Sequence, residues 1–137
     1  MARPTSALIV DDEAHVRVYV RLLLKKLGIE TTWEAADGTQ ALAMIALHRP
    51  ELVMLDINLP LMSGLEVLAT LQRERFRPPV IMMSSQSSMK TVTECVKLGA
   101  TAYILKHSPQ PQALKALAEA LDELDDSAVD SAEAGEP

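Results

Sequence analysis

Residues 52–56 read Leu52-Val53-Met54-Leu55-Asp56, an unbroken apolar run that ends in an acid. Such a run is typical of a strand inside a parallel sheet, because helices cover both faces of that sheet. A little farther on, residues 63–66 (Ser-Gly-Leu-Glu) have the spacing of a capping box, in which Ser and Glu bind the first free N–H groups of a helix. This part of the chain therefore predicts a buried strand followed by a helix.

The same alternation of short apolar runs and helix-period segments continues on both sides of this unit. The runs that we expect to be strands are residues 7–10, 30–35, 52–55, 80–83 and 102–105. The segments that we expect to be helices are residues 16–27, 37–49, 63–71, 89–96 and 108–124. Strands separated by helices pair in parallel through right-handed crossovers. The sequence therefore predicts an α/β fold, a (βα)₅ doubly wound parallel five-stranded sheet with helices on both faces.

The composition indicates one domain with an acidic end. The chain has 137 residues, 48% of them apolar, which is enough for one domain with its own core. The net charge is −6, but from residue 122 onward there are seven acids and no base, so the charge belongs to that end. We expect the domain to span residues 1–124. We expect residues 125–137, which have no apolar period, to form an acidic, disordered tail.

The same composition disfavours several classes of function. No stretch interleaves Lys and Arg with aromatic residues, so direct contact with nucleic acid is not expected. No apolar run is long enough to cross a bilayer, and the first residues are too few and too polar for a signal peptide. The single cysteine, Cys95, cannot form an intramolecular disulfide. We therefore expect a cytoplasmic protein that does not contact membranes.

Polar side chains stand where the expected strands end. Asp11 and Asp12 follow the first strand, Asp56 the third, Ser84 the fourth and Lys106 the fifth. In open parallel sheets, ligands bind outside the carboxyl ends of the strands, and neighbouring strands lie only about 4.8 Å apart. If the first and third strands are neighbours, three carboxylates converge and require a hard cation, Mg²⁺ before Ca²⁺ or Mn²⁺. With a lysine and a hydroxyl added, the arrangement can bind a phosphoryl group and offers a carboxylate as nucleophile.

Four segments, in this order, resemble the receiver domains of two-component response regulators, especially chemotaxis-regulator-like single-domain receivers. They are the acidic pair in residues 10–13, the phosphoacceptor segment 55–64, the fourth strand 79–84 and the fifth strand 99–106. The resemblance covers residues 8–121, nearly all of the expected domain. It implies a flavodoxin-like receiver fold with the strand order 2-1-3-4-5.

The resemblance implies a role for each of these residues in signal transduction. Asp56 accepts a phosphoryl group, as an acyl phosphate, from a histidine kinase or a histidine phosphotransfer protein. Lys106 pairs with a phosphoryl oxygen. Ser84 turns to hydrogen-bond the phosphoryl group and Tyr103 turns inward behind it, which remodels the face of the fourth helix, fifth strand and fifth helix for a downstream protein effector. The chain then catalyses only its own phosphorylation and autodephosphorylation in a phosphorelay and is not an enzyme.

The resemblance also implies the metal ligands. Mg²⁺, or Mn²⁺ in its place, is bound directly by Asp12, through water by Asp11, and by Asp56 and the backbone carbonyl of Asn58. Asp12 is also placed to cap the first helix, which is compatible with metal binding. The positions that tune the phosphoryl lifetime in the family are occupied by Glu13, Asn58 and Gln86.

One residue departs from the pattern of the family. His107 follows Lys106 where the family usually has a proline joined by a cis peptide. A cis peptide before a residue other than proline costs about 2.5–4 kcal/mol, so we expect a trans peptide here. We also expect Lys106 to reach the phosphoryl site despite the changed loop. The neighbouring Ser85 is small enough to leave room for the phosphoryl group.

Two other functions use similar residues. A phosphatase resembling the haloacid dehalogenase superfamily also combines Asp, Mg²⁺, a hydroxyl and Lys, but its nucleophile follows the first strand in an Asp-x-Asp pattern, whereas Asp11 and Asp12 are adjacent here. A pseudo-receiver binds partners without phosphorylation, and the complete set of site residues argues against it. We expect instead a single-domain regulator that acts as a phosphorylation-dependent binding module.

Overall fold

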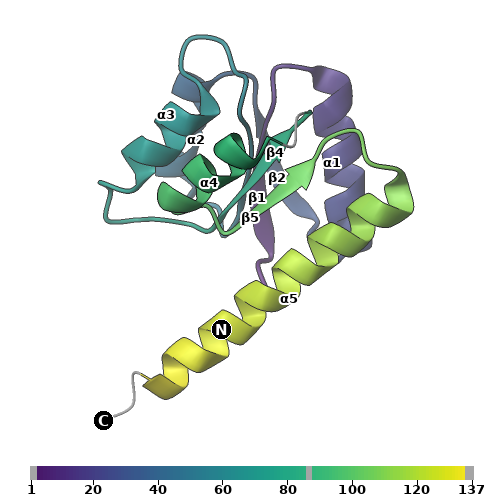
Figure 1. The fold of residues 1–137 in the computed structure, drawn as a ribbon, viewed down its shortest axis with the longest axis vertical. Coiled ribbons are helices and arrows are strands. Elements are labelled where there is room, and N and C mark those ends of the chain that lie inside the picture. Colours follow the sequence, from purple (N-terminus) through teal and green to yellow (C-terminus); the bar gives the residue numbers. More distant parts are fainter. Residues whose placement is uncertain (1–2, 86–87, 135–137) are drawn as a thin grey trace.

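The computed structural model describes residues 3–85 and 88–134, with the side chains of the last helix described as far as Leu124. Five strands and five helices alternate along these residues (Figure 1). The strands are β1 (Ser6–Val10), β2 (Thr31–Ala35), β3 (Val53–Asp56), β4 (Val80–Ser84) and β5 (Ala102–Leu105). The helices are α1 (Ala14–Lys26), α2 (Gly38–His48), α3 (Gly64–Leu71), α4 (Met89–Lys97) and α5 (Gln110–Ala134).

The strands form one sheet in the order β2-β1-β3-β4-β5, and every neighbouring pair is parallel. This confirms the predicted fold class and the predicted strand order. Strands β1, β3 and β4 are buried almost throughout, as their apolar runs predict. The two edge strands are only partly buried. The apolar run of β5 therefore belongs to an edge strand, although its sequence resembles that of a central one.

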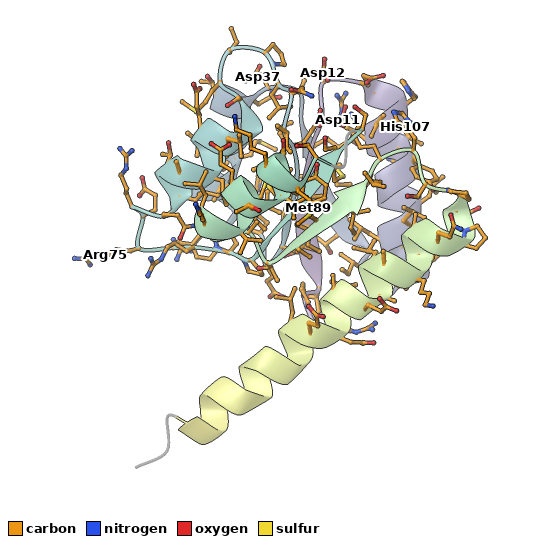
Figure 2. All side chains as sticks on the ribbon, viewed as in Figure 1. Asp11, Asp12, Asp37, Arg75, Met89 and His107 are labelled. Carbon is orange, nitrogen blue, oxygen red and sulfur yellow. The ribbon has the colours of Figure 1, made fainter. Side chains whose placement is uncertain are left out.

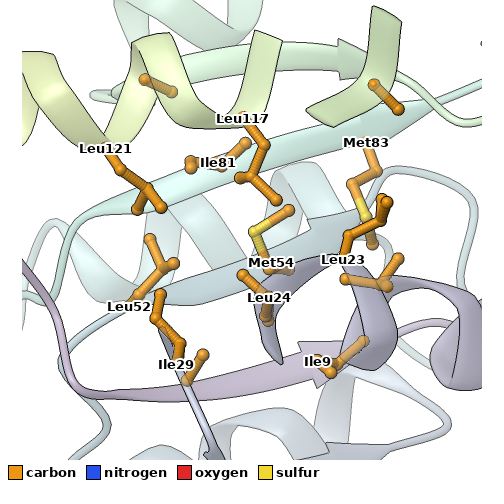
Figure 3. Packing of buried hydrophobic residues seen from close by; sticks show 14 of the residues in the cluster. Ile9, Leu23, Leu24, Ile29, Leu52, Met54, Ile81, Met83, Leu117 and Leu121 are labelled. Atoms are coloured by element: carbon orange, nitrogen blue, oxygen red, sulfur yellow. The ribbon is translucent and has the colours of Figure 1, made fainter. Parts of the chain in front are cut away.

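Helices cover both faces of the sheet (Figure 1). Helices α1 and α5 pack on one face, and α2, α3 and α4 on the other. Side chains of a strand point alternately to the two faces, so in β1 Ile9 faces α1 and α5 whereas Leu8 faces α2 and α3. Figure 3 shows the first of these layers, where Leu24 of α1 and Leu117 of α5 lie against Met54. The two layers fix the register of the strands, because a slip of one residue would exchange the faces.

The sequence signals for the helix starts are found again in the structure. At α3 the capping box is complete: Glu66 N–H donates to Ser63 Oγ at 3.2 Å, and Ser63 N–H donates to the Glu66 carboxylate at 3.3 Å. At α2 the Asp37 carboxylate accepts from the N–H of Gln40. Helix α5 begins at Gln110, and the carbonyl of Pro109, just before it, accepts from the N–H of Ala113 at 2.9 Å.

The end of the chain differs from the simplest expectation. Helix α5 runs to Ala134, well past the point where the sequence loses its apolar period, and Figure 1 shows this part of the helix extending away from the sheet. The residues there are mostly Ala, Asp, Glu and Ser, so no apolar stripe signals this part of the helix in the sequence. The division at residue 124, with an acidic disordered tail beyond it, therefore stays a prediction. No helix in residues 3–85 and 88–134 combines the length and apolar character that a membrane span needs.

Candidate functional site

Three acids meet at the carboxyl edge of the sheet. Val10 pairs with Leu55 in the β1–β3 register. The residues that follow them in the chain, Asp11 and Asp56, therefore lie side by side. One carboxylate oxygen from each of Asp11, Asp12 and Asp56 lies within 4.8 Å of the others. Asp11 and Asp56 are buried, whereas Asp12 is exposed. Figure 2 shows Asp11 and Asp12 at this edge. The predicted convergence of the three acids is thus found in the structure.

Asp11 is held in place through both its backbone and its side chain. Its N–H donates to the carbonyl of Ala35 in β2, and its Oδ1 accepts from the N–H of Glu13 at 2.9 Å. Its Oδ2 is buried and accepts no well-directed hydrogen bond within the described residues, although the Lys106 ammonium lies 2.8 Å away. A buried carboxylate oxygen of this kind, beside two further carboxylates, fits a hard divalent cation such as Mg²⁺.

Lys106 connects the buried acids. Its Nζ lies 2.8 Å from Asp11 Oδ2, 3.3 Å from Asp56 Oδ2 and 3.7 Å from Glu13 Oε1, and its side chain is only 6% exposed. The peptide to the exposed His107 is trans, as the sequence predicts. The expectation that Lys106 reaches Asp56 despite the loss of the usual proline is also confirmed.

The electrostatic surroundings shift two pKa values at this edge. Burial, together with the nearby Asp11 charge, raises the pKa of Asp56 from 3.8 to about 6, although Lys106 and the N–H of Asn58 act in the opposite direction. Burial alone would lower the pKa of Lys106, but the nearby carboxylates of Asp11 and Asp56 outweigh burial and raise it. Lys106 is therefore an ammonium at neutral pH. A divalent cation at the site would favour the ionised form of Asp56.

A close backbone approach fixes the loop after Asp56. The N–H of Gly64 donates to the carbonyl of Ile57 at 2.8 Å, and a Cβ at position 64 would lie 2.1 Å from the Asp56 carbonyl oxygen. Only glycine fits at this distance, which explains its place at the start of α3. The loop leaves Asn58 exposed next to the acids. The binding of a metal by the Asn58 carbonyl stays a prediction.

The remaining site residues lie on β4 and β5. Ser84 is buried at the end of β4, and its carbonyl accepts from the N–H of Lys106 at 2.8 Å. Tyr103 pairs with Met82 in the β4–β5 register and packs, partly buried, against the core on the α2–α4 side. Ser84 thus lies at the carboxyl edge, and Tyr103 lies inside β5, on the strand that leads to Lys106. Their switching roles stay predictions. Ser85 is exposed beside Ser84, and Gln86 lies outside the described residues.

Sequence reasoning missed two contacts and misplaced one. Arg17 of α1 donates from Nη1 to the carbonyl of Asp11 at 2.7 Å and from Nε to Glu34 Oε1 at 2.9 Å. No local sequence pattern predicts that an arginine on a helix will bond the backbone of the loop that precedes the helix. Asp12, considered as a helix cap, does not cap α1: the N-cap residue is Glu13, and its side chain makes no capping hydrogen bond.

A doubly wound parallel sheet with buried acids and a lysine at its carboxyl edge defines the class of receiver domains. The comparison with known families agrees, because residues 7–132 match the family described as "response regulator receiver domain". The chain belongs to this family. Receiver domains are signalling domains of two-component systems that interact with kinases and downstream effectors, and the family binds Mg²⁺.

Similar curated proteins are found in several bacteria. The protein CcdB of Bacillus subtilis is 34% identical over 113 residues, which cover 82% of this chain and 94% of that protein. The chemotaxis protein CheY of the same organism is 33% identical over 110 residues, with 80% and 92% coverage. The transcriptional regulatory protein PdtaR of Mycobacterium tuberculosis is 31% identical, but the match covers only 51% of that longer protein. The chain thus spans about half of this longer relative.

Solved structures agree with the fold. A CheY-like receiver domain protein from Methanospirillum hungatei has a TM-score of 0.77 at 29% identity, and the match covers 90% of this chain and 98% of that one. In a complex of CheX, CheY, BeF₃ and Mg²⁺ from Borrelia burgdorferi, the matched chain has a TM-score of 0.78 at 27% identity, with 85% and 89% coverage.

Proposed function

We propose that this receiver domain takes up a phosphoryl group on Asp56 in a Mg²⁺-dependent reaction and passes the signal to a protein partner. The observation that carries the proposal is the meeting of Asp11, Asp12 and Asp56 within 4.8 Å, with Lys106 bridging the two buried acids. Kinase and phosphotransfer protein are the expected donor classes, because both present phosphohistidine.

In the proposed transfer, an Asp56 carboxylate oxygen attacks phosphorus. A new O–P bond forms while the P–N bond to the donor imidazole breaks, and the bonding electron pair stays on that nitrogen. The Lys106 ammonium, 3.3 Å from Asp56 Oδ2, is positioned to pair with a phosphoryl oxygen and to offset its charge. Transfer needs an ionised nucleophile, so protonation of Asp56, whose pKa is raised in the metal-free protein, would slow the reaction in acid.

A bound Mg²⁺ would neutralise carboxylate and phosphoryl charge at once. Asp12, Asp11 and Asp56 are the residues that would hold it, with the carbonyl of Asn58 as a further ligand. Asp11 is well suited to this role because its Oδ2 is buried and accepts no well-directed hydrogen bond in the described residues. Asp12, which is exposed, can meet an ion that arrives from solvent.

The response to phosphorylation is proposed to run through β4 and β5. Ser84, at the end of β4, would turn its hydroxyl to the phosphoryl group. Tyr103, on the neighbouring strand β5, would then move inward. Both changes alter the face formed by α4, β5 and α5. This face is the proposed docking site of the downstream effector.

The experiment is phosphorylation by acetyl phosphate with Mg²⁺, followed by intact-mass measurement. We expect one added phosphoryl group on the wild type and none on Asp56→Asn or in EDTA. Asp37→Asn is the matched control, because Asp37 stands at the same edge of the sheet (Figure 2) and Asn serves equally well as a helix cap. It should be phosphorylated like the wild type.

The other outcomes point to other functions. Continued release of phosphate over many equivalents, from a phosphate ester that the protein hydrolyses, would favour a phosphatase. A wild type that gains no mass, yet binds a partner, would favour a pseudo-receiver. Either result would overturn the proposal.

A further inference from the structure

We infer that Arg17 is a positioning residue for the metal ligands of this site, and the inference rests on the proposed function. In the described residues, Arg17 bonds the backbone of Asp11 and not the carboxylate of Asp11, Asp12 or Asp56. Its Nη1 donates to the backbone carbonyl of Asp11 at 2.7 Å, and its Nε donates to Glu34 Oε1 at 2.9 Å. The guanidinium therefore joins three elements: α1, which carries it, the loop after β1, and β2.

The bonded carbonyl belongs to the peptide that joins Asp11 to Asp12. A hydrogen bond to that oxygen fixes the orientation of the peptide plane. The plane in turn helps to determine the direction in which the Asp12 side chain points from the backbone. The N–H on the other side of Asp11 is already held by the Ala35 carbonyl. With the Arg17 bond, both the N–H and the carbonyl of Asp11 are hydrogen-bonded. The backbone that leads to the exposed Asp12 is therefore held in one orientation.

The geometry of arginine suits this role. The guanidinium is planar and offers donors in a fixed fork, so it can hold a carbonyl and a carboxylate at the same time. Its side chain is only 17% exposed, which limits competition from water. Glu34, at 35% exposure, offsets its charge. Residues behind the ligands of a metal commonly change metal affinity by about 10- to 100-fold when they are removed.

Electrostatics alone predicts the opposite result. Arg17 is a cation close to a cation-binding site, so removing its charge should tighten Mg²⁺ binding if charge were its main effect. A positioning role predicts weaker binding on removal. The sign of the change therefore distinguishes the two explanations.

The chain offers a matched control in Arg21, one turn farther along α1. Arg21 Nη1 lies 3.9 Å from the same Glu34, and its side chain is 47% exposed. It is Arg17, and not Arg21, that donates to the Asp11 carbonyl. Arg21→Met removes a similar charge from the same helix and leaves the Asp11 carbonyl bound.

The test is a calorimetric titration of the full chain with MgCl₂, without any phosphodonor. We expect Arg17→Met to bind Mg²⁺ about tenfold more weakly than the wild type. Arg17→Lys should also bind more weakly, because one ammonium cannot hold both acceptors. Arg21→Met should bind like the wild type. Melting curves in EDTA confirm that each variant is folded, and if Arg17→Met is not, Arg17→Lys against Arg21→Lys decides the question.

The outcomes separate this inference from the proposed function. If the wild type binds Mg²⁺ and Arg17→Met binds it equally or more tightly, the positioning role is wrong and the proposed function stands. The same holds if Arg21→Met loses as much affinity as Arg17→Met. If the wild type itself binds no Mg²⁺, the proposed function is overturned, and this inference with it.

Discussion

At Asp56, burial and the neighbouring charges act against each other. Burial and the Asp11 charge raise the pKa of this carboxyl to about 6, although the Lys106 ammonium acts to lower it. In the unfolded chain the same carboxyl has a pKa near 3.8. The folded protein without metal therefore carries an unfavourable charge at neutral pH. Stability does not explain an acid at this position, whereas the proposed nucleophilic role would.

The raised pKa makes a prediction about stability in EDTA. Because the folded state holds the Asp56 proton more tightly than the unfolded state, its contribution to stability is largest below pH 4 and is lost as the pH rises through 6. Relative to Asp56→Asn, the wild type should lose about 2 kcal/mol of unfolding free energy between pH 4 and pH 7. Urea unfolding at several pH values measures this. Parallel stability curves for the two proteins would show that the shift is absent.

Lys106→Met should destabilise the protein without metal, because two buried acids then lack their cation. We expect the unfolding free energy at pH 8 in EDTA to fall by about 3 kcal/mol. Part of the loss should return at pH 5, since Asp56 can then take up a proton. The exposed Lys115 of α5 provides the control variant Lys115→Met, which should resemble the wild type. Equal stability of both variants at pH 8 would contradict the account.

At the scale of single residues, the sequence predicts which residues lie at the strand ends. It predicts few of the contacts that side chains from other elements make with them. Asp11, Asp12, Asp56, Ser84 and Lys106 were all predicted, because strand ends can be located from apolar runs. The Arg17 contacts were not, because periodicity gives the face of a helix but not the backbone atom that a long side chain finds.

At the scale of elements, the site depends on two loops that follow strands. The loop after β3 returns to α3 so closely that Gly64 packs against the Asp56 carbonyl. The loop after β1 is held by α1 and β2. The sequence predicted the helix that follows each loop, and the capping box at α3 is as expected. It did not predict the length of α5, because a helix without an apolar stripe gives no periodic signal.

Gly64→Ala tests the importance of the close approach. The added Cβ would lie 2.1 Å from a backbone oxygen, so the start of α3 or the Asp56 backbone must move. We expect a loss of about 2–3 kcal/mol in unfolding free energy and much slower phosphorylation. Gly28→Ala provides the comparison, because a Cβ there meets nothing within 4 Å and only its positive φ is strained. It should cost about 1 kcal/mol and leave phosphorylation unchanged. Normal phosphorylation of Gly64→Ala would show that the loop tolerates a shift.

At the scale of the whole molecule, the sheet separates the chemistry from the acidic end. The acids, Ser84 and Lys106 lie at the carboxyl edge, while α5 crosses one face and continues past the sheet (Figure 1). The fold class and strand order were predictable, because five alternating units leave few topologies. The end of the domain, predicted at residue 124, was harder to predict. The acidic segment after it is charged and weakly hydrophobic, but such a composition does not exclude a helix.

Deletion of residues 126–137 should leave the site intact. We expect unchanged Mg²⁺ affinity, unchanged phosphorylation by acetyl phosphate and a similar melting temperature, because the core residues of α5 end before this segment. If the segment is helical in solution, far-UV circular dichroism should show less helix in the shortened chain. A clear drop in phosphorylation or partner binding would instead assign the acidic end a regulatory contact with the body.

The most direct test of the account is a crystal structure of the protein with Mg²⁺ and beryllofluoride, a stable mimic of the phosphoryl group. The account predicts beryllium on an Asp56 oxygen, one Mg²⁺ shared by Asp12 and Asp56, and the Lys106 ammonium against a fluorine atom. An ion bound elsewhere, or Lys106 turned away from an unmodified Asp56, would contradict it.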